Sequence, residues 1–281
     1  MTRPGLSIVV PSFNQRRFIG ETLECLVNQR SVTTEELEIL VIDGGSTDGS
    51  LDVIRRYAQR IAYWVSEPDR GQTHALIKGF AAASKDVLGW LCSDDLLEPY
   101  AVREALDIFN DRPEAGFVYG DGCWIDPSGG LVKWKKEIPF HWFLWLHDHN
   151  YIPQPATFWR RKLYDAVGGL DEGFDLAMDG DLWARFAQVS RPLHVRRLWA
   201  RMRLYPEQKN QRLRARSDQE DETIRQRLGV AYRTRGHRWL CHAAAKSCRV
   251  AWKLSTGCYW QFGGNPSPNP HPSRPPMETR A

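Results

Sequence analysis

Two adjacent carboxylates stand just beyond an apolar run. Asp94 and Asp95 follow the stretch 87–92, which reads Val-Leu-Gly-Trp-Leu-Cys, and one serine. Hard divalent cations such as Mg²⁺ and Mn²⁺ take oxygen ligands, usually one or two protein carboxylates, and phosphate oxygens often complete their coordination. The pair therefore indicates a site for a divalent cation and a diphosphate. The alternative is structural, because Asp95 could simply cap a helix beside Pro99.

Three further polar clusters also follow apolar runs. They are Pro11-Ser12-Phe13-Asn14, Asp43-Gly44-Gly45-Ser46-Thr47-Asp48 and Glu67-Pro68-Asp69-Arg70-Gly71-Gln72. Helical patterns separate the runs, and this alternation is typical of a mostly parallel sheet. Because ligands bind beyond the carboxyl ends of parallel strands, we expect the four clusters to line one crevice. Asp43 taken alone could equally be a turn former before two glycines.

The elements that must position these residues can be read from hydrophobic periodicity. We expect strands at 7–11, 38–43, 61–65 and 87–92, and helices at 18–28, 51–61, 73–83 and 100–110. Residues 117–120, 122–125 and 131–137 indicate an antiparallel addition. A loop rich in Trp and His follows at 139–155, then helices from Arg161 and from about Asp181, and residues 217–260 are helical and basic.

Two common nucleotide motifs are absent. The turn after the first strand lacks G-x-G-x-x-G, and residues 44–50 lack the G-K-[ST] of a phosphate loop. These absences argue against nicotinamide-dependent and P-loop chemistry. No C-x-x-C pair signals a zinc knuckle or a redox motif either.

The polar clusters resemble, in type and in order, the motifs of family 2 glycosyltransferases. The matching segments are 7–14, 41–49, 66–71, 93–95, 153–161, 168–172 and 179–185. The resemblance implies a GT-A fold, an α/β architecture with a mostly parallel sheet flanked by helices and a small antiparallel addition. We expect a catalytic domain over residues 1–210, a basic helical extension over 211–262 and a disordered, proline-rich tail over 263–281.

The resemblance also implies roles for single residues. Positions that match the nucleotide-binding residues of the family are Pro11, Ser12, Asp43, Asp69 and Asp94. Asp94 and Asp95 match the end of its metal-binding region, which implies Mg²⁺ or Mn²⁺ as cofactor.

Asp179 matches the general base of inverting members. That residue takes the proton from the acceptor hydroxyl while the hydroxyl oxygen attacks the sugar. By residue type alone, Asp179 could instead stabilise the first turn of a helix. Gln154 and Trp183 are candidates for contact with the acceptor or the diphosphate, although a polar loop residue and a packing tryptophan need no such role.

Two positions depart from the pattern of the family. Cys92 stands where many relatives have an acid, so Asp94 and Asp95 would hold the metal alone. Tyr205 stands where a histidine is common. The chain also lacks the Q-x-x-R-W signature of processive synthases, which favours the addition of one sugar per encounter.

We therefore expect an inverting glycosyltransferase. It would move a sugar from a nucleotide-diphosphate donor, a UDP-sugar before others, to a saccharide or lipid-linked acceptor in the assembly of cell-surface polysaccharide or glycolipid. Cys92 and Tyr205 motivate one alternative, a catalytically weak nucleotide-sugar-binding protein. A second alternative is a nucleotidyltransferase that uses the same kind of nucleotide-binding sheet.

Charge is distributed unevenly along the chain. Residues 1–190 contain 19 Lys and Arg against 28 Asp and Glu, whereas residues 191–260, the basic arm, contain 17 against 5. Basic residues among tryptophans suit an anionic membrane surface, and a solvated helical surface is the simpler interpretation. No nucleic-acid-binding motif accompanies the charge, so we expect no nucleic-acid partner. No signal-peptide pattern opens the sequence, so we expect a cytoplasmic location, with the arm as a candidate for peripheral contact with the membrane.

The segment 140–149 contains three histidines and several aromatic residues. His141, His147 and His149 lack the i, i+4 pairing of common hydrolytic zinc sites, which argues against a zinc site here. The segment could form a wall for the acceptor, press on a lipid surface or pack in the core.

Overall fold

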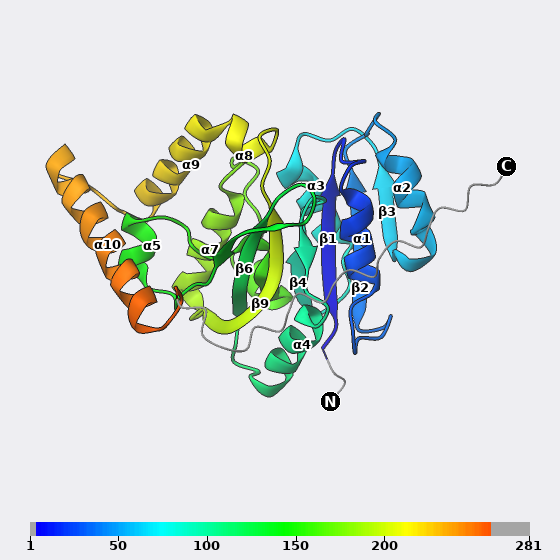
Figure 1. Cartoon of the computed structure of the whole chain (residues 1–281), viewed down its shortest axis with the longest axis horizontal. Helices are drawn as coiled ribbons and strands as arrows, with labels where there is room; N and C mark the ends of the chain where they lie inside the picture. Colours follow the sequence, from blue (N-terminus) through cyan, green and yellow to red (C-terminus); the bar gives the residue numbers. More distant parts are fainter. Residues whose placement is uncertain (1–3, 260–281) are drawn as a thin grey trace.

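A central twisted sheet with helices on both faces forms the body of the protein (Figure 1). The structure is a computed structural model, and it describes residues 4–259. Four parallel strands form the first half of the sheet: β1 (Leu6–Ser12), β2 (Leu37–Asp43), β3 (Tyr63–Ser66) and β4 (Val87–Trp90). Their order is β3-β2-β1-β4. The predicted parallel arrangement is confirmed.

Helices connect these strands as the periodicity predicts. They are α1 (Ile19–Val27), α2 (Ser50–Arg56) and α3 (Gln72–Ala82). The second is shorter than expected, because the chain tightens after Arg56 into the 3₁₀ turn η1 (Ala58–Arg60), where the Arg60 amide donates to the Tyr57 carbonyl. The third strand therefore starts at Tyr63 rather than at Ile61.

The second half of the sheet is mixed. Its strands are β5 (Leu96–Leu97), β6 (Phe117–Ile125), β7 (Leu131–Lys135), β8 (Thr157–Arg160) and β9 (Leu193–Arg203). The order continues from β4 as β8-β6-β9-β5, with β7 beside β6. β8 runs antiparallel to β4 and β6, and β7 runs antiparallel to β6. The predicted antiparallel addition is present, and the runs 117–120 and 122–125 form one continuous strand.

Strand β9 was not predicted from the sequence. It contains four arginines, at positions 196, 197, 201 and 203, so its composition hides its role in the sheet. It pairs in parallel with β6. Gly120 of β6 allows this pairing, since a Cβ at that position would lie 2.7 Å from the ring of Trp199 on β9.

Alternating side chains of the sheet enter two hydrophobic cores, one on each face. In β1, Val9 belongs to the core under α3, whereas Ile8 and Val10 belong to the core under α1. The helices of the second half are α4 (Ala101–Asp111), α5 (Trp142–His147), α6 (Arg161–Ala166) and α7 (Met178–Val189), and a 3₁₀ turn η2 (Gln154–Ala156) precedes β8. The expected loop 139–155 thus contains the short helix α5, whose Leu144 and Trp145 are buried.

The chain ends in α8 (Lys209–Arg212), α9 (Arg214–Arg227) and α10 (Arg235–Ser255). Helix α9 packs on α7, and α10 packs on α5 at the far side of the molecule from α2 (Figure 1). The expected boundary between residues 210 and 211 falls inside α8. The expected tail 263–281 lies outside the described residues. Between residues 4 and 259, no helix has the length and apolar character needed to cross a membrane.

Candidate active site

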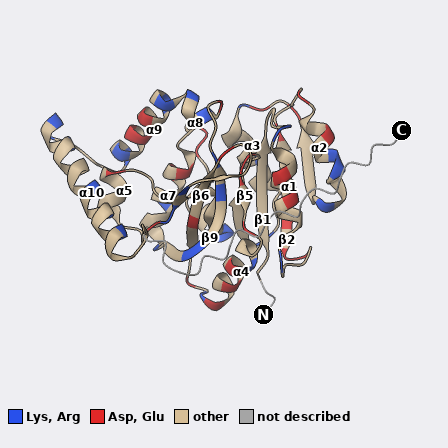
Figure 2. Cartoon of the chain, in the orientation of Figure 1, with Lys and Arg blue, Asp and Glu red and all other residues tan. Residues whose placement is uncertain are grey.

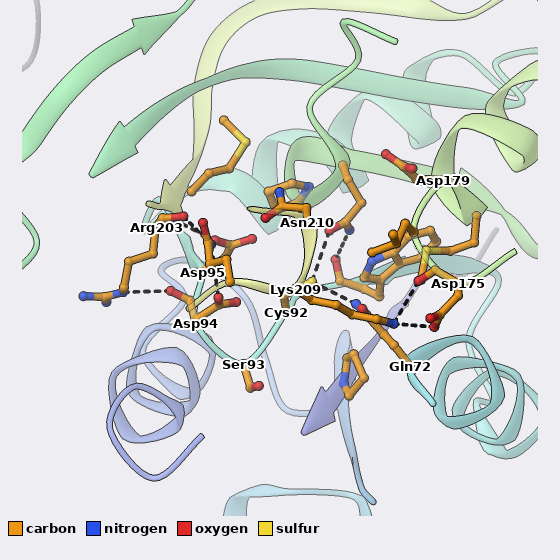
Figure 3. A pocket seen from close by; sticks show the side chains of 18 of the residues that line it. Gln72, Cys92, Ser93, Asp94, Asp95, Asp175, Asp179, Arg203, Lys209 and Asn210 are labelled. Atoms are coloured by element: carbon orange, nitrogen blue, oxygen red, sulfur yellow. Dashed lines mark hydrogen bonds and ion pairs between the residues drawn. The ribbon is translucent and has the colours of Figure 1, made fainter. Parts of the chain in front are cut away.

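A cavity of about 1340 Å³ opens at the carboxyl ends of the parallel strands. It brings together most of the predicted site residues. Those that line it are Pro11, Ser12, Asp69, Asp94, Asp95, Gln154 and Asp179. Asp94 and Asp95 are grouped with Arg203 on one side of the close-up view, and Asp179 lies on the other side (Figure 3). The predicted crevice is therefore present, with its acids at two separate places.

Ser12 and Asp69 present polar atoms to this cavity. The Ser12 side chain is buried, and its hydroxyl has no hydrogen-bond partner among residues 4–259. Asp69 accepts a hydrogen bond from the Gly71 amide at 2.8 Å through Oδ1. Gly44 lies against Asp69 so closely that a Cβ would be 2.7 Å from Asp69 Oδ2. The buried Ser12 hydroxyl is therefore available to a ligand, since burying a polar group without a partner is unfavourable.

Asp43 does not line the cavity. Its carboxylate is buried and accepts hydrogen bonds from the amides of Gly45 (3.1 Å) and Ser46 (2.9 Å) and from the Ser66 hydroxyl (2.7 Å). These bonds fix the turn after β2, which places Gly44 beside Asp69. Asp43 thus shapes the crevice, and its direct contact with a nucleotide stays a prediction.

The two adjacent carboxylates have different surroundings. Asp95 is buried, and the Arg203 backbone amide donates to its Oδ1 at 2.9 Å. Burial, and then the charge of Asp94, raise the pKa of Asp95 well above its ordinary value. Asp94 accepts hydrogen bonds through Oδ2 from the Tyr205 hydroxyl at 2.8 Å and from the Gln208 amide at 3.3 Å.

A divalent cation fits this acidic pair. The ligand atoms of Cys92, Asp94 and Asp95 lie within 4.8 Å of one another. Two carboxylates this close repel each other, and a bound cation offsets that repulsion with the oxygen ligands that Mg²⁺ and Mn²⁺ prefer. Burial, and then the charge of Asp95, raise the pKa of the Cys92 thiol well above its ordinary value, so the thiol is neutral without a cation.

Arg203 holds the loop that carries this pair. Its guanidinium is fully buried and donates to the carbonyls of Asp94 (2.9 Å) and Pro127 (2.8 Å) and to the Glu21 carboxylate (2.8 Å). Five donors in a planar fork suit this bridging of separate segments. Tyr205, two residues later, therefore reaches Asp94 from a rigid support.

The Gln154 side chain contacts two residues at the base of the cavity. Its amide donates to the Trp90 carbonyl at 2.7 Å, and its Oε1 faces the Cys92 sulfur at 3.6 Å. Gln72 donates to the same sulfur at 3.3 Å (Figure 3). Cys92 thus occupies a polar network between β4, α3 and η2.

Asp179 stands in the first turn of α7. The Asn150 amide donates to its Oδ2 at 3.1 Å. Asn150 Oδ1 in turn accepts from the Trp145 indole (3.3 Å) and the Ile152 amide (3.2 Å), so the NH₂ group must face Asp179. Burial raises the pKa of Asp179 to about 6, and the charge of Asp221 adds to this effect.

Helix α7 begins at Met178, three residues before the expected start. The reason lies in α9, because the Glu220 carboxylate accepts hydrogen bonds from the amides of Leu176 (2.8 Å) and Ala177 (2.9 Å). A carboxylate at this position satisfies backbone donors that have no partner within the helix. Glu220 of α9 thus caps the start of α7 together with Asp179, whose carboxylate accepts from its own amide and from that of Gly180.

Trp183 lies in the core rather than in the acceptor region. Its indole is fully buried and stacks on Trp90 at 5.7 Å and on Phe117 at 6.0 Å between ring centroids. It does not line the cavity, although Trp90 above it does. Its role is to support the floor.

Three residues that shape the site were not predicted: Asn150, Gln208 and Asp221. They lie on loops and on α9, outside the strand ends that periodicity identifies. The sequence feature nearest to any of these three residues is the polar end of the segment 140–149, which directly precedes Asn150.

The histidines of that segment have separate partners. His147 Nδ1 faces the Tyr232 hydroxyl at 2.8 Å, His149 faces Asp148 at 3.2 Å, and the His141 ring contacts Trp252. The three side chains therefore do not converge on one metal site.

Comparison with known proteins agrees with this architecture. The sequence model described as Glycosyl transferase family 2 matches residues 7–166. An uncharacterized glycosyltransferase of Mycobacterium tuberculosis is 31% identical over 194 residues, covering 69% of this chain and 72% of that protein. The chondroitin synthase of Escherichia coli is 26% identical over 69% of this chain and 28% of its own length.

Two solved structures share the fold. S. aureus TarS 1-349 in complex with UDP-GlcNAc has a TM-score of 0.65 at 15% identity, covering 92% of this chain and 76% of that chain. The mannosyltransferase PcManGT from Pyrobaculum calidifontis, in complex with GDP-Man and Mn²⁺, has a TM-score of 0.61 at 20% identity, covering 95% of this chain and 78% of that chain. Taken with the strand order and the crevice, these matches show that the chain belongs to glycosyl transferase family 2 and has the GT-A fold.

Proposed function

We propose that this glycosyltransferase transfers a sugar from a nucleoside-diphosphate donor to a hydroxyl of a saccharide or lipid-linked acceptor, with inversion at the anomeric carbon. One observation carries the proposal. A single cavity contains an acidic pair suited to a divalent cation and, apart from it, a carboxylate whose pKa is raised to about 6. Transfer with inversion requires one group for the leaving diphosphate and a separate base for the incoming hydroxyl.

The donor end would be formed by the loops after β1, β3 and β4. Pro11, Ser12 and Asp69 line this part of the cavity, and the unpartnered Ser12 hydroxyl is a donor that a nucleotide could use. We expect a UDP-sugar. The related folds in complex with UDP-GlcNAc and GDP-Man support a nucleotide sugar as donor.

Asp94 and Asp95 would hold Mg²⁺ or Mn²⁺. When bound, the cation would offset the negative charge that develops on the departing nucleoside diphosphate. The protein positions the two carboxylates through Arg203, Tyr205 and Gln208. The PcManGT complex with Mn²⁺ supports a divalent cation in this fold.

Asp179 would act as the base. The acceptor oxygen forms a bond to the anomeric carbon, its proton passes to Asp179, and the bond from that carbon to the diphosphate oxygen breaks with its electron pair. A carboxylate with a pKa near 6 is ionised at neutral pH and is a better proton acceptor than an ordinary aspartate. Asn150 holds it in one orientation.

The test begins with ligand binding. A thermal-shift panel of nucleoside diphosphates and nucleotide sugars, with and without Mn²⁺, should give its largest stabilisation for one nucleotide sugar with the metal. The selected donor should then release nucleoside diphosphate on incubation with acceptor. Release of pyrophosphate would favour the nucleotidyltransferase alternative, and binding without turnover would favour the weak nucleotide-sugar binder.

The proposed setting is cell-surface polysaccharide or glycolipid assembly. An O-antigen biosynthesis protein of Myxococcus xanthus, 30% identical over 67% of this chain and 15% of that protein, supports it. We also propose weak contact between α10 and an anionic membrane. Exposed Trp239 and Leu240, beside exposed Arg235, support this contact.

A further inference from the structure

Helix α9 crosses α7 immediately beside Asp179. Gly180 forms the crossing point, since a Cβ there would lie 3.6 Å from Ile224 of α9 and 3.6 Å from the Asn150 amide. Glu220 of α9 also holds the backbone that leads into α7. The helix after residue 210 is therefore part of the wall of the cavity, and its position relative to Asp179 is fixed by two contacts.

One acid of α9 faces the cavity from this wall. Ser217, Asp221 and Ile224 share a face of the helix at i, i+4 and i+7, and both Ser217 and Asp221 line the cavity. Asp221 is partly buried. Within residues 4–259, no hydrogen bond or ion pair holds its carboxylate, in contrast to its neighbour Glu220. Asp221 thus offers hydrogen-bond acceptors to whatever occupies this end of the cavity.

We infer that Asp221 is an acceptor-binding residue that selects an acceptor without negative charge around its reacting hydroxyl. The inference rests on the proposed function. Ionised carboxylates accept hydrogen bonds and cannot donate them, so hydroxyl groups suit Asp221, whereas a uronate or phosphate group would be repelled by Asp221 and Asp179 together. The acceptor class is therefore a neutral polyhydroxyl compound, such as a hexose or hexosamine residue, at the position next to the new bond.

Asp179 and Asp221 lie among other charged groups, and these groups determine which variants can test the inference. The charge of Asp221 on α9 raises the pKa of Asp179, and the charge of Asp179 raises that of Cys92, beyond the end of β4. Asp221 is itself near Asp218, Glu220 and Arg225 on α9 and near His149 on the loop before Asn150. Asp218 is exposed, lies one turn from Asp221 and does not line the cavity, so it provides a matched control for removal of one negative charge.

The first measurement is the pH dependence of donor hydrolysis, which needs no acceptor. In the full chain with Mn²⁺ and UDP-GlcNAc, or GDP-mannose if the binding panel selects it, the rate should fall below about pH 6. Asp221→Asn should move this acid limb to lower pH by about half a unit or more, because it removes a charge that disfavours ionised Asp179. Asp218→Asn should leave the limb in place. An acid limb that moves equally in both variants, or in neither, overturns the inference.

The second measurement uses two probes that differ only at C6, methyl β-D-glucoside and methyl β-D-glucuronide. Saturation-transfer NMR with UDP and Mn²⁺ should show stronger contact for the glucoside in the wild-type protein. Asp221→Asn should raise the relative signal of the glucuronide at least threefold, and Asp218→Asn should not. Equal signals for the two probes in the wild-type protein, or a glucuronide preference, contradict the inference. Failure of the proposed function is distinguishable, because it would appear as absent donor hydrolysis in the wild-type protein.

Discussion

Asp179 has surroundings that oppose its charge, and this opposition has two measurable consequences. Burial raises its pKa to about 6 from an ordinary value of 3.8. A carboxyl group whose pKa is higher in the folded state destabilises the fold as pH rises between these two values. The same shift makes Asp179 a stronger base at neutral pH, so its proposed catalytic role and its cost in stability have one physical origin.

Asp179→Asn should therefore separate activity from stability. Transfer should fall by about 10²- to 10⁴-fold, since a general base is removed, while the nucleotide should bind as before. At pH 8 the free energy of unfolding of the variant should exceed that of the wild type, by no more than about 3 kcal/mol, and its melting temperature should be higher. This advantage should disappear near pH 4, where the wild-type carboxyl is protonated. Undiminished turnover would remove Asp179 from the mechanism.

Asn150 should influence the same acid in the opposite direction to Asp221. Its amide donates to Asp179 and so favours the ionised form. Asn150→Ala should move the acid limb of the pH–rate profile to higher pH. It should also lower the rate at neutral pH by about tenfold or more, with nucleotide affinity unchanged. Asn150→Asp should not restore the rate. A variant that loses activity with no change in the pH profile would indicate a purely structural role.

Among the elements, the parallel first half of the sheet and the antiparallel addition could be predicted, whereas β9 could not. Strands β1, β2 and β4 are continuous apolar runs, because helices cover both of their faces. Arg201 and Arg203 of β9 pair with Glu98 and Glu21, whereas Arg196 and Arg197 of the same strand are exposed, so charge in that strand marks ion pairing at its end and solvent exposure at its middle. Hydrophobic periodicity cannot distinguish an ion-paired arginine from a solvent-exposed one, because the ion-pair partners lie far away in the sequence.

The same limit applies to the site. Acids at strand ends were identified because parallel strands deliver them to one edge. Asn150 bonds to Asp179, and Asp221 acts on it by its charge, only because α5 and α9 pack beside α7, which no local pattern encodes. Conversely, Trp183 has the residue type of a binding site but packs in the core, while Asp43 holds the turn after β2 and its contact with a nucleotide stays a prediction.

A buried ion pair joins helix α10 to the body of the protein, and we expect the attachment of the helix to depend on it. Lys253 lies 2.7 Å from Glu137, and Lys135 contacts the same carboxylate at 3.1 Å. Burial would raise the pKa of Glu137, but the two lysines outweigh it and hold that pKa below its ordinary value. Lys253→Met should destabilise the protein by about 3–5 kcal/mol in urea unfolding, because it leaves Glu137 with less compensation for burial.

The exposed Lys246→Met provides the control on the same helix, and it should change stability by less than about 0.5 kcal/mol. The double variant Glu137→Gln with Lys253→Met should recover part of the loss, since the uncompensated charge is gone. If Lys253→Met were no more destabilising than Lys246→Met, the ion pair would not hold α10.

At the scale of the whole molecule, the basic arm is less free than its composition indicates. Most of its cations form ion pairs with acids of the body or of the arm itself. The pairs include Arg216–Asp175, Arg227–Asp171, Arg238–Glu222 and Arg249–Asp148. Helix α10 carries five Lys and Arg, of which Arg238, Arg249 and Lys253 form ion pairs, and a basic segment is visible at its N-terminal end (Figure 2). The segregated charge therefore serves chiefly to attach the arm to an acidic body.

Any membrane contact through α10 should consequently be weak and sensitive to salt. The full chain should co-sediment with vesicles that contain phosphatidylglycerol at low ionic strength and should be released above about 0.3 M salt, because few cations remain for the surface.

Reversing two exposed cations of α10, Arg235→Glu with Lys246→Glu, should lower binding more than tenfold at about 1 kcal/mol per charge. Arg55→Glu with Arg56→Glu on α2, at the opposite end of the molecule, reverses the same number of exposed cations and should bind almost as the wild type does. Equal loss in both double variants would show that net charge, rather than the α10 surface, governs the contact. No binding by the wild type, where a basic control peptide binds, would rule out the contact and leave the arm with its role in the wall of the cavity.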